Sequence, residues 1–428
     1  MLVLIRDLYP LCRSITGPGL RATIERLARD IPIRTTEVPT GTPVFDWIIP
    51  REWSISEAFV EHESGRRFAE FADSNLHVMS YSAPVDTVLS LAELRPHLYS
   101  LPAHPDWVPF RTSYYDEAWG FCLADRVKCA LPDGSYRVVI RSRLQDGALT
   151  LAECIKEGDT GEEVLIFAHT CHPSLCNDNL SGIAVAAHLA KYLQDIQMRY
   201  TYRFVFAPAT IGSIAWLALN EKILPRIKHG LVLAMLGDDG PLRYQLTRDG
   251  GALIDRAARH VLRHHCPESQ VLDFSPWGFD ERQFATPGIN LPVGRLTRAL
   301  TGQFPEEHTS ADNLGLISAA ALADSWEACL RIFQVLESDA RYLNLRPRGE
   351  PQLGRRGLYR STGGHYDGVP ERHLALLWIL NQSDGRASLL DIAERARLPL
   401  PLVAAAAADL KAAGLLQAVD GTDGEVCP

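Results

Sequence analysis

Residues 163–182 read EVLIFAHTCHPSLCNDNLSG, and this stretch decides the fold class. Its opening part, 163–169, is a short apolar run of the kind found in strands that are buried on both faces. A helical pattern, GIAVAAHLAKYLQDI, follows at 182–196. A strand followed by a helix predicts an α/β domain, in which ligands bind beyond the carboxyl ends of the strands.

The same alternation continues toward the C-terminus. Further buried strands are predicted at 202–209 and 229–237, and helices at 214–224 and 252–264. A long amphipathic helix at 318–338 closes the pattern. We therefore predict a mixed, mainly parallel sheet that is flanked by helices.

The length of 428 residues predicts two or three domains. Residues 40–150 combine many aromatics, scattered prolines and short alternating runs, which indicates an inserted β-rich domain. A Pro/Gly/Arg-rich linker at 346–357 precedes a pattern of three helices and a strand that is typical of a winged helix. The predicted division is a core domain at 1–42 and 150–345, an inserted β-rich domain at 43–149, and a winged-helix domain at 358–428.

Charge and composition exclude several classes of partner. The net charge of −9 argues against nucleic acid and anionic membranes. Acidic residues outnumber basic ones in the winged-helix segment, so we predict no nucleic-acid partner. No apolar stretch is long enough to span a membrane, and the chain does not begin like a signal peptide. The nine dispersed cysteines indicate free thiols and a cytoplasmic protein. Homo-oligomerisation remains open.

The loop after the first strand contains potential metal ligands. Imidazole nitrogens and carboxylate oxygens are the usual mixed ligands of catalytic zinc, which makes His172 and Asp178 the leading pair. His169, at the end of the strand, is a further candidate. The third ligand must come from elsewhere, and the best candidate is His308 in the polar segment FPEEHTSADNL (304–314).

The cysteines of this loop allow two other interpretations. Cys171 and Cys176 have a spacing that a structural zinc site can use, but no second cysteine pair accompanies them. Cys171 beside His172 suggests a thiol nucleophile, although adjacent residues in a loop rarely face each other. Buried packing is the simpler explanation for both cysteines. Ser181 is best explained as a helix N-cap.

Two segments offer groups for acid–base chemistry and substrate binding. The segment WGFDERQF (277–284) contains Asp280, Glu281 and Arg282. Carboxylates also surround His308, and such groups commonly orient a ligating imidazole. These flanking acids are Glu306, Glu307 and Asp312.

Two motifs resemble those of zinc-dependent aminopeptidases related to bacterial leucyl aminopeptidase. AHTCHPSLCNDNLSG (168–182) resembles the segment that carries that family's first metal ligands, and EEHTSADNL (306–314) resembles its terminal motif, whose histidine binds metal. One branch, bacterial aminopeptidase-like proteins often labelled as polysaccharide biosynthesis proteins, is similar to this chain from end to end. Its matching segments include LCRSITGPGLRAT (11–23) and VPTGTPVFDWIIPREW (38–53).

The resemblance implies an aminopeptidase core with an inserted β domain and a C-terminal winged helix. It also implies metal binding by His169 or His172, by Asp178 as the bridging ligand, and by His308. Four carboxylates of the family are missing at three places in this sequence. Cys171 replaces an Asp, Pro208-Ala209-Thr210 replaces a Glu-Glu pair, and Ala234 stands where a further Asp is expected.

Fewer carboxylates mean less negative charge to hold two cations together, so we predict one zinc ion rather than two. The missing general base must also be replaced, and the candidates for catalysis are Glu281, Glu306 and Asp280. Arg282, Asp312 and Glu307 are the candidates for substrate binding.

The predicted function is a zinc-dependent, aminopeptidase-like hydrolase. It would cleave an amide bond next to a free amino group in a small peptide or an aminoacylated biosynthetic intermediate. The alternative is a non-catalytic binding or scaffold protein that retains the aminopeptidase fold, which the absent Glu-Glu pair motivates.

Overall fold

A computed structural model describes residues 1–300, 302–358 and 370–419. Contacts within the chain define two compact units. The first contains Met1–Ala252 and Glu268–Glu327, and the second contains Leu253–Pro267 and Ala328–Pro428. The three-part division made from the sequence (1–42 with 150–345, 43–149 and 358–428) remains a prediction, and residues 359–369 and 420–428 lie outside the described residues.

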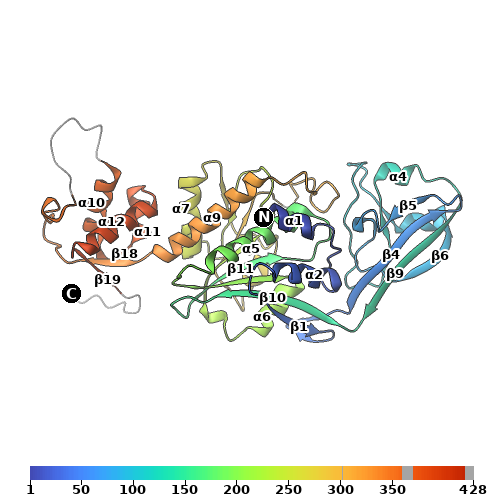
Figure 1. Cartoon of the computed structure of the whole chain (residues 1–428), viewed down its shortest axis with the longest axis horizontal. Helices are drawn as coiled ribbons and strands as arrows, with labels where there is room; N and C mark the ends of the chain where they lie inside the picture. The colour runs from blue at the N-terminus through green and yellow to red at the C-terminus, as the bar shows by residue number, and fades with distance from the viewer. Residues whose placement is uncertain (301, 359–369, 420–428) are drawn as a thin grey trace. The chain divides into compact units, whose positions relative to one another are not determined.

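An eight-stranded mixed sheet forms the centre of the first unit (Figure 1). Its middle is parallel, because β11 pairs in parallel with β12 and β13, and β13 pairs in parallel with β16. Antiparallel pairs flank this middle on both sides. In spatial order the strands are β1 (Arg34–Pro39), β10 (Ala148–Lys156), β12 (Thr201–Ala207), β11 (Glu163–His169), β13 (Ile227–Leu233), β16 (Val293–Thr297), β14 (Arg243–Gln245) and β15 (Gln270–Leu272).

Strand β11 confirms the interpretation of the stretch at 163–169. All of its residues are buried, because helices cover both faces of the sheet. Helices α5 (Gly182–Leu193) and α6 (Ile211–Leu219) lie on opposite faces, as Figure 1 shows. Since β11 and β12 are parallel and in register at His169 and Ala207, the loops after them open at the same edge of the sheet.

The first unit contains further helices. They are α1 (Leu2–Leu8), α2 (Pro18–Leu27), α3 (Leu91–Leu94), α4 (Asp125–Cys129) and α8 (Glu281–Phe284), and α9 (Ala319–Ser338) begins in it. None of the helices in the described residues has the length and apolarity that crossing a membrane requires.

A four-stranded antiparallel sheet lies within the region predicted to be β-rich. Its strands are β4 (Glu52–His62), β5 (Arg67–Glu70), β6 (Val85–Ser90) and β9 (Ser135–Gln145). The sheet has an apolar cluster of its own, to which Val60, Tyr136 and Ile140 contribute. The aromatic and alternating pattern of 40–150 is therefore explained by a small, separately packed sheet.

The second unit has winged-helix architecture. It combines α10 (Glu371–Gln382), α11 (Leu389–Ala396) and α12 (Leu400–Ala412) with a sheet of β18 (Asp384–Ser388), β17 (Arg341–Asn344) and β19 (Leu416–Val419). Helix α7 (Leu253–His265) belongs to the same unit, because Arg256 pairs with Asp391 and Glu394 at 2.7 and 2.6 Å. The C-terminal winged helix predicted from the sequence is thus confirmed.

A buried network of ion pairs joins strands β10, β11 and β12. Arg203 on β12 lies 2.7 Å from Glu163 on β11 and 2.9 Å from Glu153 on β10. The indole of Trp216 donates to Glu153 at 2.8 Å. The Glu163 side chain is fully buried, and its charge is offset by Arg203 and by the half-exposed Arg226, whose Nη2 lies 3.3 Å from Glu163 Oε1.

We expect Arg203→Met to lower the free energy of unfolding by up to about 3–5 kcal/mol, because it leaves the buried carboxylate of Glu163 with only the half-exposed Arg226 as a partner. Arg141→Met is the matched control, since Arg141 pairs with Glu57 at 2.8 Å but both side chains are about half exposed. That variant should cost ~1 kcal/mol or less. Urea denaturation measures both, and equal losses would contradict the network's role.

Candidate metal centre

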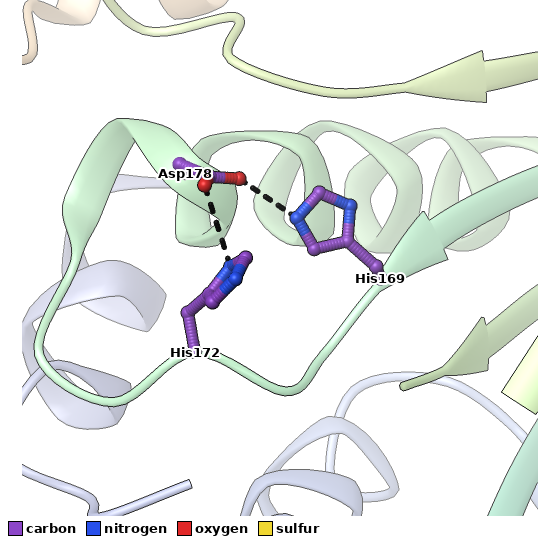
Figure 2. Close-up of side chains that lie close together, drawn as sticks. All are labelled: His169, His172 and Asp178. Atoms are coloured by element: carbon purple, nitrogen blue, oxygen red, sulfur yellow. Dashed lines mark hydrogen bonds and ion pairs between the residues drawn. The ribbon is translucent and has the colours of Figure 1, made fainter. Parts of the chain in front are cut away.

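Three side chains converge where β11 ends (Figure 2). His169 is the last residue of β11, His172 lies in the following loop, and Asp178 lies in the π-helical turn Cys176–Ser181 that leads into α5. His169 Nε2 is 2.7 Å from Asp178 Oδ1, and His172 Nδ1 is 3.4 Å from Asp178 Oδ2. The stretch that decides the fold therefore also builds the centre of the site.

His308 joins this group from a distant loop. Its Nε2 lies 2.9 Å from Asp178 Oδ2, so the two carboxylate oxygens have different neighbours. Oδ1 faces His169, whereas Oδ2 faces His172 and His308. The His308 ring remains 45% exposed, which leaves one side of the group accessible.

The charges of these groups are strongly coupled. Burial lowers the pKa of His172 to about 4, against the opposing effect of Asp178. Burial alone raises the pKa of Asp178, but the neighbouring His172 and His169 outweigh it and hold that pKa well below its ordinary value. For His308, burial lowers the pKa, and the adjacent Asp178 more than offsets this and raises it. Asp178 is therefore a buried anion.

The residues fit a metal ion. His172 Nδ1 and Asp178 Oδ2 are buried, and neither finds a hydrogen-bond partner within the described part of the chain. Buried polar atoms are rarely left in this state, and a bound cation would satisfy both. Two sets of side chains bring their ligand atoms within 4.8 Å of one another: His169 with His172 and Asp178, and Asp178 with Glu307 and His308.

The loop of His308 is held by segment 108–110, from the region predicted to be inserted. His308 has a left-handed backbone, with φ of +57°, a conformation that costs energy for a residue with a side chain. Phe110 N donates to His308 O at 2.7 Å, and Ser310 N donates to Val108 O at 2.8 Å. The Phe110 ring also contacts the rings of His172 and His308, with centroids 5.4 and 5.6 Å away. No local sequence pattern predicted these contacts between segment 108–110 and the loop of His308.

Arg13 fixes the loop that carries His172. This arginine is buried, and its Nε and Nη2 donate to the carbonyl oxygens of His172 and Pro173 at 2.7 and 3.2 Å. Its Nη1 donates to Leu8 O at 2.5 Å. Sequence reasoning missed this role, although Arg13 lies in one of the segments that carried the family resemblance.

Asp312 acts on the backbone of the ligand loop. Its Oδ1 accepts hydrogen bonds from the amides of Cys176 and Asn177 at 3.1 and 2.5 Å, and its Oδ2 accepts from Asp178 N at 2.9 Å. The residue is fully buried, and burial raises its pKa to about 7. Asp312 was a candidate for substrate binding, but the structure places it beneath the loop that carries Asp178.

The segment at 277–284 lies beside His169, with the Phe279 ring stacked on the imidazole at 5.1 Å. Asp280 and Glu281 are fully buried. Asp280 Oδ1 accepts from Ser213 Oγ at 2.6 Å, and Glu281 Oε1 lies 3.0 Å from Arg295 Nη1. Burial raises the pKa of Asp280 to about 7. These two predicted acids adjoin the histidines, but neither belongs to the described sets of ligand atoms.

Two cavities meet at His172 and His308. The first, of about 290 Å³, also contacts Cys171, Ala209 and Glu307, so it includes the place where the family resemblance implies a Glu-Glu pair. Its other walls include Trp47, Tyr115, Trp277 and Arg282. The second, of about 470 Å³, is lined by the segment Phe110–Tyr114 and by Tyr99. Glu306, the neighbour of Glu307, does not line either cavity.

The cysteines of the loop are buried. Burial raises the pKa of Cys171 to about 12, and burial also raises the pKa of Cys176. A protonated thiol is a poor nucleophile and a poor metal ligand. Neither cysteine belongs to the described sets of ligand atoms. This favours packing as their role.

A mixed sheet with a His/Asp cluster beyond its parallel strands defines an aminopeptidase-like α/β protein. The fold is similar to that of a zinc aminopeptidase from Bacillus subtilis, with a TM-score of 0.57 and 13% identity over 77% of this chain and 93% of that chain. At this identity the likeness concerns the fold alone.

The chain belongs to the family described as domain of unknown function DUF4910, whose model matches residues 2–339. Residues 340–418 match a winged helix-turn-helix model. A Clostridium acetobutylicum relative, by name a candidate polysaccharide biosynthesis protein with an aminopeptidase-like domain, is 48% identical over 97% of this chain and 95% of its own length. A crystal structure described as a candidate peptidase from the same organism has a TM-score of 0.93 and 46% identity over 98% of this chain and 96% of that one. The family resemblance and fold class inferred from the sequence are confirmed.

The raised pKa of Asp280 predicts a pH effect on stability. Its folded-state pKa of about 7 exceeds the ~3.9 of an unfolded aspartate, so the folded state holds the proton more tightly between these values. The contribution to stability is present below about pH 4 and is lost as the pH rises through about 7. The unfolding free energy of the wild type, relative to Asp280→Asn in metal-free protein, should therefore fall between pH 4 and pH 8. A pH-independent difference would contradict this.

Proposed function

We propose that the chain is a zinc-dependent, aminopeptidase-like hydrolase with a single metal ion held by His172, Asp178 and His308. The observation that carries the proposal is the convergence of three ligand atoms: His172 Nδ1 and His308 Nε2 lie 3.4 and 2.9 Å from Asp178 Oδ2, while His172 Nδ1 and Asp178 Oδ2 are buried and form no hydrogen bond with any described residue. Zinc in such a site supplies Lewis acidity, which polarises a carbonyl oxygen and makes water a better nucleophile at neutral pH.

The two oxygens of the Asp178 carboxylate have different neighbours, and this supports one ion rather than two. Oδ2 faces the two proposed histidine ligands, whereas Oδ1 is occupied by His169 at 2.7 Å. We therefore assign His169 to orienting the carboxylate. A second ion would need further carboxylates, and Cys171, Ala209 and Ala234 stand where the related enzymes supply them.

Glu307 is our candidate for the missing general base. It is the carboxylate that lines the cavity next to Ala209, and its ligand atom lies within 4.8 Å of those of Asp178 and His308. Gly302 N donates to its Oε2 at 3.1 Å. Glu306 lines neither cavity, and Glu281 is paired with Arg295. We therefore assign the general base to Glu307 instead of the residues favoured by the sequence.

The proposed substrate has a free amino group next to the scissile amide, as in a small peptide or an aminoacylated biosynthetic intermediate. The fold shared with a zinc aminopeptidase and the name of the 48% identical relative support this class. A cytoplasmic location belongs to the same proposal. The second candidate, a non-catalytic binding protein, is favoured by the absence of a carboxylate at Ala209.

We expect the purified protein to bind about one zinc ion per chain and to lose it in Asp178→Asn and His308→Ala, because each removes one of three ligands. Elemental analysis and zinc titration measure this. Protein that contains no zinc and takes up none on titration would overturn the metal site. Two tightly bound ions per chain would overturn the single-ion assignment.

Glu307→Gln should lower kcat for aminoacyl anilides by ~10²–10⁴-fold while zinc content stays the same, because only proton transfer is lost. Glu306→Gln is the adjacent control, and its kcat should stay close to that of the wild type. An equal loss in both variants would contradict the assignment. Zinc-loaded wild type that cleaves no aminoacyl anilide or dipeptide would favour the non-catalytic alternative.

A further inference from the structure

The larger of the two cavities at the site contains an arginine that has no assigned role. Arg111 lines the 470 Å³ cavity together with His172 and His308. The residue is exposed, so its guanidinium can meet a ligand without first being uncovered. No carboxylate in the described part of the chain forms an ion pair with it, and the guanidinium lies over the Tyr99 ring at 4.7 Å from the centroid.

The backbone of Arg111 is fixed relative to the metal ligands. Ser80 N donates to Arg111 O at 2.8 Å, and the preceding residue, Phe110, donates through its amide to His308 O at 2.7 Å. The Phe110 ring contacts both His172 and His308. A guanidinium that lies over an aromatic ring, on a backbone segment held by hydrogen bonds, loses little freedom when it binds a ligand.

Polar groups surround this arginine on the cavity wall. Thr112 Oγ1 accepts a hydrogen bond from Tyr114 N at 3.3 Å, and a hydroxyl that accepts in this way can still donate its own proton. Ser113 and Asp116 also line the cavity. Asp116 is not within ion-pair distance of Arg111, but its charge opposes an anion in the same space.

Resting on the proposed hydrolase function, we propose that this cavity binds an anionic group of the substrate, a carboxylate or a phosphate, through Arg111. The planar guanidinium fork matches either oxyanion. The proposed substrates are then amides that carry a negative charge on the portion bound in the Arg111 cavity. The first cavity, which is lined by Glu307 and aromatic side chains, holds the part of the substrate that lies on the other side of His172 and His308.

The test uses two pairs of compounds that differ in charge. Leucylglycine and leucylglycine amide form the carboxylate pair, and leucyl-phosphoethanolamine and leucyl-ethanolamine form the phosphate pair. Zinc-loaded full-length protein is assayed for turnover, and calorimetry measures binding of the same four compounds. We expect the charged member of at least one pair to have KM and Kd roughly ten-fold lower, or better, than its neutral partner. The pair that shows the preference identifies the oxyanion.

Arg111→Gln should abolish the charge preference by raising KM and Kd for the charged compound, with zinc content and kcat for the neutral compound unchanged. Arg111→Lys should keep part of the preference, since it retains the charge but not the fork. Asp116→Asn should increase the preference, because it removes a repelling charge. Arg66→Gln is the matched control, because Arg66 is also exposed and lies 4.7 Å from the Phe68 centroid but lines neither cavity.

The outcomes separate this proposal from the hydrolase function on which it rests. Turnover without a charge preference, or a preference that survives Arg111→Gln, overturns the anion site and leaves the hydrolase intact. Charge-selective binding that depends on Arg111, with no turnover of any compound, overturns the hydrolase and supports the anion site. If the protein shows neither turnover nor charge-selective binding, both proposals are overturned.

Discussion

The site depends on one buried charge, the carboxylate of Asp178. A fully buried carboxylate is costly unless it is paired, and this one is surrounded by His169, His172 and His308. Its two oxygens have different neighbours, which separates an orienting histidine from the two proposed to bind metal. Beneath it, Asp312 accepts hydrogen bonds from the amides of the same loop and so fixes where the carboxylate points. The remaining features of the site serve to hold groups around this anion.

Two distant parts of the chain hold those groups. Arg13, near the N-terminus, fixes the carbonyl of His172, and segment 108–110 fixes the backbone of His308. Because His308 has a left-handed backbone, its position requires such external support. The β-rich region is thus part of the centre, since Phe110 contacts two of the proposed ligands. The same region lines the cavity that we assign to an anionic group.

The lost carboxylates and the retained histidines have a common physical consequence. The family resemblance implies acids at the positions of Cys171, Ala209 and Ala234, and with those acids missing we propose a single ion, because little negative charge is left to hold two cations close together. A single ion would need less compensation, and His172 would supply a neutral ligand. The space beside Ala209 is where Glu307 is placed, so a carboxylate from another loop faces the cavity from which the usual pair is absent.

The sequence by itself determined the α/β class, the succession of three central strands along the chain and the winged helix, because these follow from local apolar patterns that repeat along the chain. It also pointed to His172, Asp178 and His308, whose residue types and loop positions suit a metal ion. Only the tertiary structure placed Glu307 rather than Glu306 on the cavity wall, showed Asp312 bonded to the backbone of the loop, and revealed the contacts of Arg13 and Phe110. The physical reason is that the contacts of Asp312, Arg13 and segment 108–110 join parts of the chain 134 to 202 residues apart, which no local pattern encodes.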